Sequence, residues 1–467
     1  MTKIFVRNFI CIFLLSMSLG CVPGAHPARQ ALRVTSGQTL ASLYFSTTGI
    51  FTEKVSFDLG EVALLVGDLW IDLPAPPVAI GRQQAQGKQL LLGFGPFPTG
   101  ECRRVRFKLS RIRVDENPQA EFADQLIELP FQQPVSFAGN DSTCLFVDWH
   151  LTAQMLENSR FAPTFSARGQ EIPLGGDLIY VLCDNIDTLY LVRTDQNMVA
   201  ASFGLPGPLG EIALDGRNQK LYVVSTGARL LHQFNSVNAR SFDRIALPIA
   251  VNPRHLALSA DGDFAFVTDS ATNQVLKIDL FRGVIARQAT VGLRPERIHF
   301  FDDGSPRLAI SSPTAQRVYV LSADNLDIQR EIPAGVEPDS LLYGDGRLYV
   351  AERGNQSVAV FDYRSGRQLA RVAVGYEPVG MIEVDGRIYV GNAGDSYLSA
   401  FYAGQNTSAL RIATGEGPVA LAVSERRRML YIAEREAKAL AVMDLSSERV
   451  KAVVPLGGRP TFLAVLD

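Results

Sequence analysis

A repeat of about 40 residues runs through the C-terminal part of the chain and strongly limits the folds available to it. Seven short segments that end on proline mark its boundaries. The prolines are Pro208, Pro253, Pro295, Pro338, Pro378, Pro418 and Pro460, with spacings of 45, 42, 43, 40, 40 and 42 residues. Because proline cannot donate to a β-ladder, each one should lie where a strand is entered and not inside it. The repeat therefore predicts a series of similar β-structured units.

Each unit has the same internal order. A short apolar strand follows the proline and leads to a tight turn, most often Asp-Gly, as at Asp345-Gly346. Asp-Gly supplies the positive-φ residues of a two-residue hairpin, so the first two strands should be antiparallel neighbours. The second strand has the pattern of LYVA at 348–351 or IYVG at 388–391, and two further strands lead to the next proline. Four-stranded units of this length, packed face to face around an axis, form an all-β propeller.

The two ends of the repeat region complement each other. After Pro460 the chain holds only TFLAVLD, enough for one first strand. The region begins near Asp177 with IYVL, DTLYLV and VAASFG, which match strands two, three and four without a first strand. Joining the C-terminal strand to this incomplete unit predicts a closed ring of seven blades over 177–467, which leaves no unpaired edge between its ends.

Two of these units resemble a known family. The segments LYVAERGNQSVAVFDYRSGRQLARVAVGYEP and IYVGNAGDSYLSAF are similar to the repeats of bacterial seven-bladed propellers named for their Tyr-Val-Thr-Asn motif, part of the wider lactonase-like group. The resemblance covers about 290 residues, from 177 to the end. It implies the fold, but it selects no activity, because propellers carry unrelated functions.

Residues 32–165 lack the repeat. Strand-like runs such as RRVRFKLSRIRV and CLFVDWHL are separated by glycine and proline turns at β-sandwich spacing. The runs PFPTGECRRVRFKL and STCLFVDWHL resemble an immunoglobulin-like or transthyretin-like domain found near the N-terminus of bacterial lipoproteins. We therefore expect a smaller β-sandwich-like domain, followed by a linker at 166–176.

One run of this domain is strongly basic. It contains Arg103, Arg104, Arg106, Lys108, Arg111 and Arg113. These side chains either face an anionic surface, such as lipid headgroups or acidic polysaccharide, or form a solvent face balanced by Asp115, Glu116 and Glu121. The apolar alternation shifts by one residue at Ser110-Arg111, which predicts a β-bulge.

The N-terminus has the features of an export signal. Lys3 and Arg7 precede an apolar run at Phe9–Leu19, which has signal-peptide length and is too short to span a membrane as a mature helix. We therefore expect a signal peptide at 1–20 and a tether at 21–31.

The signal ends at Ser18-Leu19-Gly20-Cys21, which resembles the bacterial lipobox, although that pattern prefers Leu, Val or Ile at the position of Ser18. The resemblance implies lipidation of Cys21, and acyl chains would anchor the protein to a lipid bilayer. Val22 after the cysteine resembles the pattern sorted to the outer membrane of Gram-negative bacteria. The alternative is ordinary signal-peptide cleavage, in which Cys21 has no role.

Three cysteines follow Cys21. Cys102 and Cys144 begin two strand-like runs of the same domain, so they are the expected disulfide pair in an oxidising compartment. Cys183 lies inside an apolar run and is expected to be buried. No Cys-x-x-Cys motif is present, which argues against a redox dithiol or covalently attached haem.

Propeller geometry predicts which residues surround the channel. The loops that enter each first strand and the loops between second and third strands share one rim. The candidate binding residues on this rim are Arg254, His255, Glu296, Arg297, His299, Glu337, Asp339, Glu352 and Arg353. They belong to blades three to five, whereas Val379 and Val419 leave blades six and seven apolar. A mixed-charge rim beside a channel suits ligand binding, although loop residues are also charged because they contact water.

Two histidines on this rim allow a chemical alternative. His255 and His299, with Glu296 or Asp339, could ligate a divalent metal or form an acid–base pair. The alternative, which is the commoner role of such a histidine, is that each fills space between blades and donates one hydrogen bond. The sequence has no compact hydrolase, metalloprotease, Walker or dinucleotide motif, so no cofactor is predicted and a metal at the rim stays open.

These features predict a monomeric, membrane-anchored, non-catalytic binding protein whose propeller rim holds a protein, a polysaccharide or a small ligand. The alternative is a lactonase-like hydrolase, which the resemblance of the propeller implies and which could use the acidic, arginine and histidine groups at the rim. Nucleic acid is not expected as a partner, since the formal net charge is -3 and no basic, aromatic-rich stripe is present.

Overall fold

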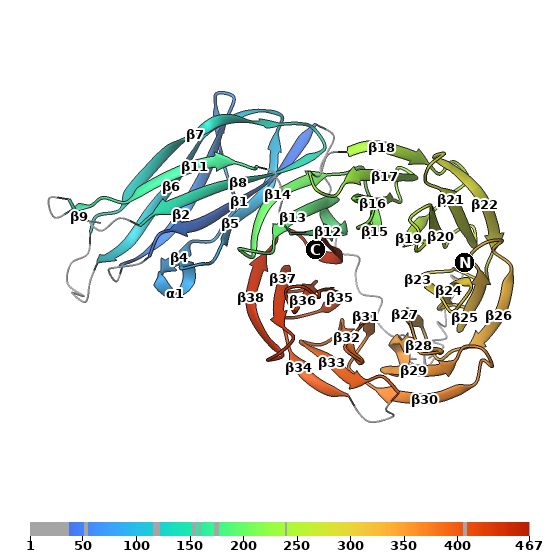
Figure 1. Cartoon of the computed structure of the whole chain (residues 1–467). Coiled ribbons are helices and arrows are strands. Elements are labelled where there is room, and N and C mark those ends of the chain that lie inside the picture. The colour runs from blue at the N-terminus through green and yellow to red at the C-terminus, as the bar shows by residue number, and fades with distance from the viewer. Residues whose placement is uncertain are drawn as a thin grey trace, which may run out of the picture. The chain divides into compact units, whose positions relative to one another are not determined.

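A computed structural model describes residues 37–50, 55–114, 122–151, 156–157, 160–171, 177–238, 241–404 and 409–466. These residues form a nine-stranded β-domain and a seven-bladed propeller, both visible in Figure 1. The predicted signal peptide, the tether and Cys21 lie outside the described residues. None of the helices in the described ranges combines the length and hydrophobicity needed to cross a bilayer.

The propeller is built from seven four-stranded antiparallel blades, each of which runs from an innermost strand to an outermost one. Blade one contains, in this order, β39 (Pro460–Leu466), β12 (Leu178–Cys183), β13 (Thr188–Arg193) and β14 (Met198–Gly204). Blade two contains β15 (Leu209–Asp215), β16 (Lys220–Ser225), β17 (Leu230–Asn235) and β18 (Ser241–Ala246). Blade three contains β19 (Pro253–Leu258), β20 (Phe264–Asp269), β21 (Gln274–Asp279) and β22 (Val284–Thr290).

The remaining four blades repeat this arrangement. Blade four contains β23 (Ile298–Asp302), β24 (Pro306–Ser312), β25 (Arg317–Ser322) and β26 (Ile328–Pro333). Blade five contains β27 (Pro338–Gly344), β28 (Arg347–Glu352), β29 (Ser357–Asp362) and β30 (Gln368–Ala373). Blade six contains β31 (Pro378–Val384), β32 (Arg387–Asn392), β33 (Tyr397–Tyr402) and β34 (Leu410–Ala413). Blade seven contains β35 (Pro418–Ser424), β36 (Met429–Glu434), β37 (Ala439–Asp444) and β38 (Arg449–Pro455). Short 3-10 turns, η1 (Asp184–Ile186) and η2 (Arg353–Asn355), join the second and third strands of blades one and five.

The ring closes as the sequence predicts. The C-terminal strand β39 pairs antiparallel with β12, with Leu178 opposite Leu466 and Leu182 opposite Phe462. Figure 1 shows this last strand, in red, inside the first blade. The first sheet therefore takes its innermost strand from the far end of the chain, and the predicted seven-bladed propeller is confirmed.

Apolar second and third strands hold the blades together. In blade five, Leu348, Tyr349 and Val350 of β28 are almost completely buried. Side chains of neighbouring blades share cores, as where Tyr222 of blade two packs with Leu256 and Val267 of blade three. Burial on both faces explains why these strands are apolar at nearly consecutive positions.

The N-terminal domain is one curved sheet that is nearly closed into a barrel. Its strand order is β3-β2-β6-β7-β11-β8-β1-β5, and β4 pairs with β2. The strands are β1 (Gln38–Thr48), β2 (Val55–Val66), β3 (Leu69–Asp72), β4 (Val78–Gly81), β5 (Leu90–Pro98), β6 (Gly100–Val114), β7 (Gln125–Phe137), β8 (Asp141–His150) and β11 (Thr164–Gly169). A short helix α1 (Arg82–Ala85) and a small pair, β9 (Leu156–Glu157) with β10 (Arg160–Phe161), accompany it. A single sheet thus encloses a core around Phe57, Phe107 and Trp149.

The end of this domain lies later in the chain than the sequence suggests. Residues 166–169, predicted as the start of a linker, belong to β11, which pairs with β8 and β7. The error has a simple cause, because the strand-like run TFSARG is short and follows a proline.

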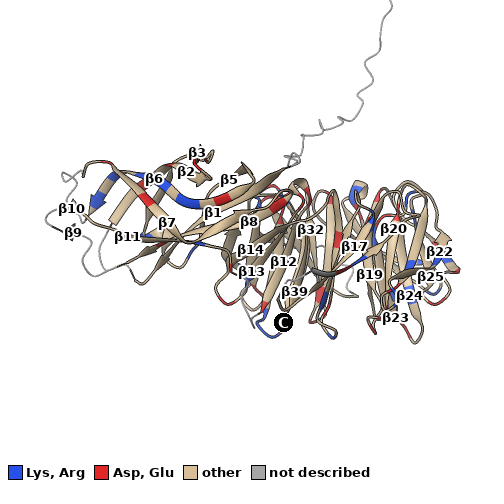
Figure 2. Cartoon of the chain, turned by 90° about the horizontal axis from the view of Figure 1, so that it is seen from above, with Lys and Arg blue, Asp and Glu red and all other residues tan. Residues whose placement is uncertain are grey.

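The basic strand is β6, and four of its six basic side chains form ion pairs within the domain. Ser56 and Asp58 of β2 pair with Arg113 and Ser110, so that β6 holds one extra residue there and the predicted bulge is confirmed. Arg111, at the bulge, has a φ of 50°. The ion pairs of the strand are Arg103–Glu101, Arg104–Glu128, Lys108–Glu61, Lys108–Asp124 and Arg111–Asp58. Figure 2 shows basic and acidic segments close together around β6. The three carboxylates expected as partners, Asp115, Glu116 and Glu121, lie outside the described residues.

The disulfide predicted between Cys102 and Cys144 is not formed. Both thiols are free and buried, as is that of Cys183. Cys102 on β6 belongs to the core inside the curved sheet. Cys144 on β8 belongs to a different core, which includes side chains of blade one, and its Sγ lies 3.3 Å from Ser202 Oγ. The sequence places both cysteines in one domain but does not show that their strands present them to opposite faces.

Blade one and the N-terminal domain share a buried seam. The side-chain oxygen of Gln170 accepts hydrogen bonds from the backbone N–H groups of Cys144 (2.9 Å) and Ser202 (3.0 Å). The Gln89 amide donates to the Val199 carbonyl at 3.1 Å and accepts from the Val199 N–H at 2.8 Å. These bonds satisfy backbone groups along the outer strand of blade one, and residues 32–467 form one compact unit.

Candidate functional site

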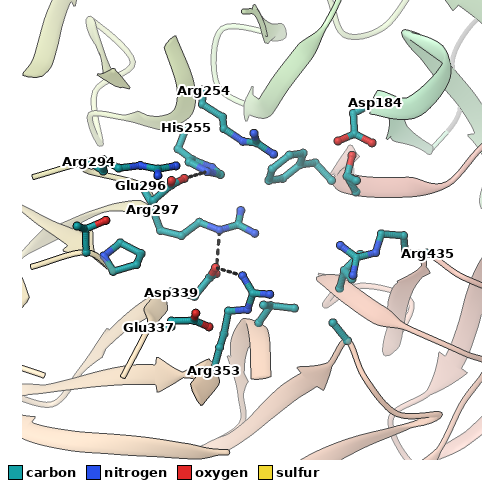
Figure 3. A pocket seen from close by; sticks show the side chains of 17 residues that line it. Asp184, Arg254, His255, Arg294, Glu296, Arg297, Glu337, Asp339, Arg353 and Arg435 are labelled. Atoms are coloured by element: carbon teal, nitrogen blue, oxygen red, sulfur yellow. Dashed lines mark hydrogen bonds and ion pairs between the residues drawn. The ribbon is translucent and has the colours of Figure 1, made fainter. Parts of the chain in front are cut away.

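A cavity of about 480 Å³ opens at one mouth of the propeller channel (Figure 3). Seven of the nine predicted rim residues line it, namely Arg254, His255, Glu296, Arg297, Glu337, Asp339 and Arg353. The other lining residues are Asp184, Arg294, Pro313, Thr314, Val379, Ala393, Val419, Arg435, Thr461 and Phe462. The predicted asymmetry is present, because the charged residues come mainly from blades three to five and the aliphatic ones from blades six and seven.

A β-bulge at the entry to the first strand directs these side chains toward the channel. In blade three, Pro253 pairs with Asp269 and His255 with Thr268, so Arg254 is an extra residue. The same shift occurs in blades one, two, five, six and seven. A bulge breaks the normal alternation of side chains between the two faces of a sheet. Consecutive residues such as Arg254 and His255 can therefore both line the cavity.

Glu211 on β15 lies at the centre of a charged network beneath the mouth. Its carboxylate lies 3.2 Å from His255 Nδ1, accepts a hydrogen bond from the Leu256 N–H at 3.1 Å, and lies 3.6 Å from Arg297 Nη1. On the other side of the same imidazole, His255 Nε2 lies 3.5 Å from Glu296. Burial raises the pKa of Glu211, but the His255 hydrogen bond and the Arg297 charge outweigh it, so the pKa lies below its usual 4.5. The ring of His255, which is 4% exposed, is thus held between two carboxylates.

Sequence reasoning missed Glu211 because blade two is offset by one residue. Leu209, and not Pro208, pairs with the last residue of the second strand, Ser225. In the other blades with an assigned pair the proline itself takes this place, as Pro253 does opposite Asp269. Glu211 therefore occupies the position equivalent to His255. One sequence feature could have revealed Glu211: it is an acidic residue that follows Gly210 inside an otherwise apolar first strand.

Arg297 and Arg353 share a carboxylate. Arg297 Nε lies 3.1 Å from Asp339 Oδ1, and Arg353 Nη1 lies 4.0 Å from Asp339 Oδ2. Arg353 also contacts Glu377 at 3.6 Å. Burial lowers the pKa of Arg297, but Asp339 and Glu211 raise it more, so the guanidinium stays charged. Its charge also lies 4.9 Å above the Phe462 ring, which fixes its direction.

Other arginines at the mouth keep unused binding capacity. Among the described residues, no carboxylate oxygen lies within 4.0 Å of the guanidinium nitrogens of Arg254 or Arg294. Arg435 lies 3.6 Å from its neighbour Glu436, which also pairs with Arg459 at 2.9 Å. Figure 3 shows Arg254, Arg297, Arg353 and Arg435 extending into the same opening. Burial raises the pKa of Asp184 nearby, against the opposing effect of Arg254 and Arg435.

Two predicted rim residues, His299 and Glu352, do not line the mouth. His299 lies further along β23, where its Nε2 accepts a hydrogen bond from the Tyr343 N–H at 3.3 Å and its ring stacks on Phe301. Burial lowers the pKa of His299 to about 4, so the ring is neutral. The alternative interpretation, a histidine that fills space between blades, therefore describes His299.

Glu352 is a structural acceptor. It is fully buried at the end of β28, where it accepts from the Gly335 N–H at 2.7 Å and pairs with Arg371 at 3.0 Å. The last residue of the second strand has this role in several blades. The equivalent bonds are Val251 N–H to Asp269, Gly375 N–H to Asn392 and Gly415 N–H to Glu434. A carboxylate at this position holds the blade junction and does not face the channel.

The chemistry of the mouth is that of a fixed ionic surface. Within the described ranges, no group of three or more His, Cys, Asp or Glu residues is arranged to hold a metal ion. The hydroxyl groups that line the cavity belong to Thr314 and Thr461, and Thr461 donates to the Leu182 carbonyl at 3.2 Å. Neither hydroxyl is hydrogen-bonded to His255. The cavity is lined mainly by arginines, carboxylates and the imidazole of His255.

An arc of exposed apolar side chains surrounds the charged mouth. Val251, Leu293, Val336 and Tyr376 each lie two residues before a junction proline, in four successive junctions. They are 60%, 56%, 43% and 59% exposed. Apolar groups around a polar centre provide contact area for a ligand that extends beyond the cavity.

Comparison with known proteins identifies the fold alone. No family model matches the chain, and no curated protein sequence matches it. A functionally unknown protein from Desulfotomaculum acetoxidans DSM 771 aligns with a TM-score of 0.55 and 14% identity, over 62% of this chain and 99% of that one. Hydrazine synthase from Kuenenia stuttgartiensis aligns with a TM-score of 0.50 and 16% identity, over 55% of this chain and 89% of that one. These alignments support the β-propeller.

Proposed function

We propose that this protein is an exported, lipid-anchored binding protein that holds a ligand at the mouth of its propeller and does not transform it. The observation that carries the proposal is the preorganised surface of the mouth. Glu211 and Glu296 contact opposite sides of the His255 ring, and Asp339 pairs with Arg297 and Arg353. Side chains that are fixed before binding lose little entropy when a ligand arrives.

Support for export and anchoring comes from the N-terminal sequence. The apolar run that ends at Gly20-Cys21 resembles a lipoprotein signal, and Val22 is compatible with the outer membrane of a Gram-negative bacterium. In this proposal, acyl chains hold the protein at a bilayer surface as a monomer, while the propeller mouth binds a small molecule, a glycan or a segment of a partner protein.

Blocking the mouth tests this proposal. Thr314 is an exposed residue that lines the cavity, so Thr314→Trp should fill the cavity with little effect on the core. Thr290→Trp, at an exposed position at the end of β22, is the matched control. The purified protein is titrated by calorimetry with neutral sugars, sugar acids, amino acids and inorganic phosphate. We expect at least one compound, charged or neutral, to bind the wild type and the control but not Thr314→Trp. Equal binding to all three proteins, or to none, would contradict a ligand site at the mouth.

The position of His255 supports a second candidate function, that of a lactonase-like hydrolase. His255 lines the cavity and lies between Glu211 and Glu296, an arrangement that could serve a lactonase-like hydrolase as an acid–base group. Sugar lactones and acyl lactones are therefore incubated with the protein, with and without EDTA. Turnover that is lost in His255→Gln would support the hydrolase and refute a purely binding role.

A further inference from the structure

We infer that the ligand at the propeller mouth carries an oxyanion, a carboxylate or phosphate group, that is bound by the guanidinium groups of Arg254 and Arg294. This inference rests on the proposed function and specifies the chemical class of its ligand. Both arginines line the cavity, and both side chains are exposed to solvent.

Some of the carboxylates at and beneath the mouth already have partners, whereas two of the arginines do not. Three of the carboxylates there are engaged, Glu211 and Glu296 with His255 and Asp339 with two arginines. Arg254 and Arg294 have no carboxylate within ion-pair distance among the residues that the structure describes. They are close enough to Glu296 to lower its pKa, although burial raises it and the His255 hydrogen bond is the larger of the lowering effects. Two guanidinium groups are therefore available at a cavity that is lined by five arginines and four carboxylates. Two of these carboxylates, Asp184 and Glu337, also form no ion pair among the described residues.

The backbone holds these two arginines in defined positions. Arg254 is the extra residue of the bulge between Pro253 and His255. Arg294 precedes Pro295, has a φ of 51°, and donates its backbone N–H to Asn273 Oδ1 at 2.8 Å. Because the backbone is fixed, the planar guanidinium groups are held in a reproducible geometry. The paired N–H donors of a guanidinium group match the paired oxygens of a carboxylate or phosphate group.

Apolar side chains in the same cavity indicate what the rest of the ligand resembles. Phe462, Val379 and Val419 form an apolar wall of the same cavity. These side chains are 7%, 7% and 4% exposed, so only their edges contact the cavity. An inorganic ion would leave these edges in contact with water, whereas an oxyanion joined to a compact organic body would cover them. A sugar acid or a sugar phosphate has this combination of a charged group and C–H surface.

The experiment compares three ligands that share one body. Glucuronate, glucose 6-phosphate and glucose are titrated by calorimetry at about 50 mM salt, where screening is moderate. We expect at least one of the two anions to bind the wild type at least tenfold more tightly than glucose. The binding should weaken at least tenfold in Arg254→Ala/Arg294→Ala, and less in Arg254→Lys/Arg294→Lys. The difference between glucuronate and glucose 6-phosphate then separates carboxylate from phosphate recognition.

Arg282→Ala is the matched control, because Arg282 is an arginine of blade three whose side chain is 77% exposed and lies outside the cavity. Its affinity should equal that of the wild type, and all variants should keep the wild-type melting temperature. If glucose binds as tightly as the anions and is excluded by Thr314→Trp, the inference is overturned while the proposed function stands. If no anion binds, or if the double variant binds as tightly as Arg282→Ala, the inference is also overturned.

Discussion

Replacement of Glu211 tests whether the charged network at the mouth is an ordered part of the fold. Glu211→Ala removes the acceptor of the Leu256 N–H and the anionic partner of His255 and Arg297. Hydrogen bonds to a charged group contribute about 1.5 kcal/mol or more each, and Arg297 retains Asp339. We therefore expect the free energy of unfolding to fall by about 3 kcal/mol. Breaking a buried ion pair can cost about 5 kcal/mol, but the loss should be smaller here because Arg297 keeps Asp339 as a second carboxylate partner. Urea unfolding followed by far-ultraviolet circular dichroism measures the change.

The control for this experiment is Glu337→Ala. Glu337 is an exposed carboxylate at the same mouth and forms no ion pair among the described residues, so its loss should change stability by less than about 0.5 kcal/mol. An equal effect of the two substitutions would refute the role of Glu211.

The pH dependence of the stability gives a second check. Because the pKa of Glu211 is lowered in the folded protein, its stabilisation is present above about pH 4.5 and is lost as the pH falls through the folded value. The difference between the wild type and Glu211→Gln should therefore narrow below pH 4.5.

Three further predictions concern the ring, the seam and the anchor. Deletion of residues 461–467 removes β39 from blade one, so the shortened protein should lose its cooperative unfolding transition; an unchanged transition would contradict ring closure. Gln170→Ala leaves the N–H groups of Cys144 and Ser202 without their acceptor and should lower the stability by about 2 kcal/mol, whereas Gln288→Ala, on the exposed face of β22, should have no measurable effect in the same urea titration. Cys21→Ser should abolish incorporation of labelled palmitate and release the protein from the membrane fraction, and retention of the label would refute lipidation at this residue.

The propeller could be predicted from the sequence because its signals are local and repeated. Junction prolines, Asp-Gly turns and apolar second strands each report on a few neighbouring residues, and seven copies reinforce one another. The missing first strand near Asp177 and the single strand after Pro460 added a long-range constraint, and the observed pairing of β39 with β12 satisfies it.

The parts that could not be predicted depend on register and on which face a side chain occupies. A one-residue offset in blade two placed Glu211 in the network beneath the mouth. The expected bond between Cys102 and Cys144 failed because their strands direct them into separate cores. Glu352 is charged and lies at the end of a second strand, as expected of a rim residue, but its carboxylate accepts a hydrogen bond from the Gly335 N–H at a blade junction. Hydropathy patterns do not distinguish a solvent-exposed carboxylate from a buried carboxylate that accepts hydrogen bonds from protein donors.

The most direct test of ligand binding at the mouth is a crystal structure of the mature protein purified from its native membrane without denaturation. We expect electron density for an organic anion in the cavity, with its oxygen atoms within hydrogen-bonding distance of Arg254 and Arg294 and its body against Phe462. Two results would contradict ligand binding at the mouth by these arginines. In one, the mouth is empty and the bound ligand lies at another site of the protein. In the other, the molecule in the mouth contacts neither arginine.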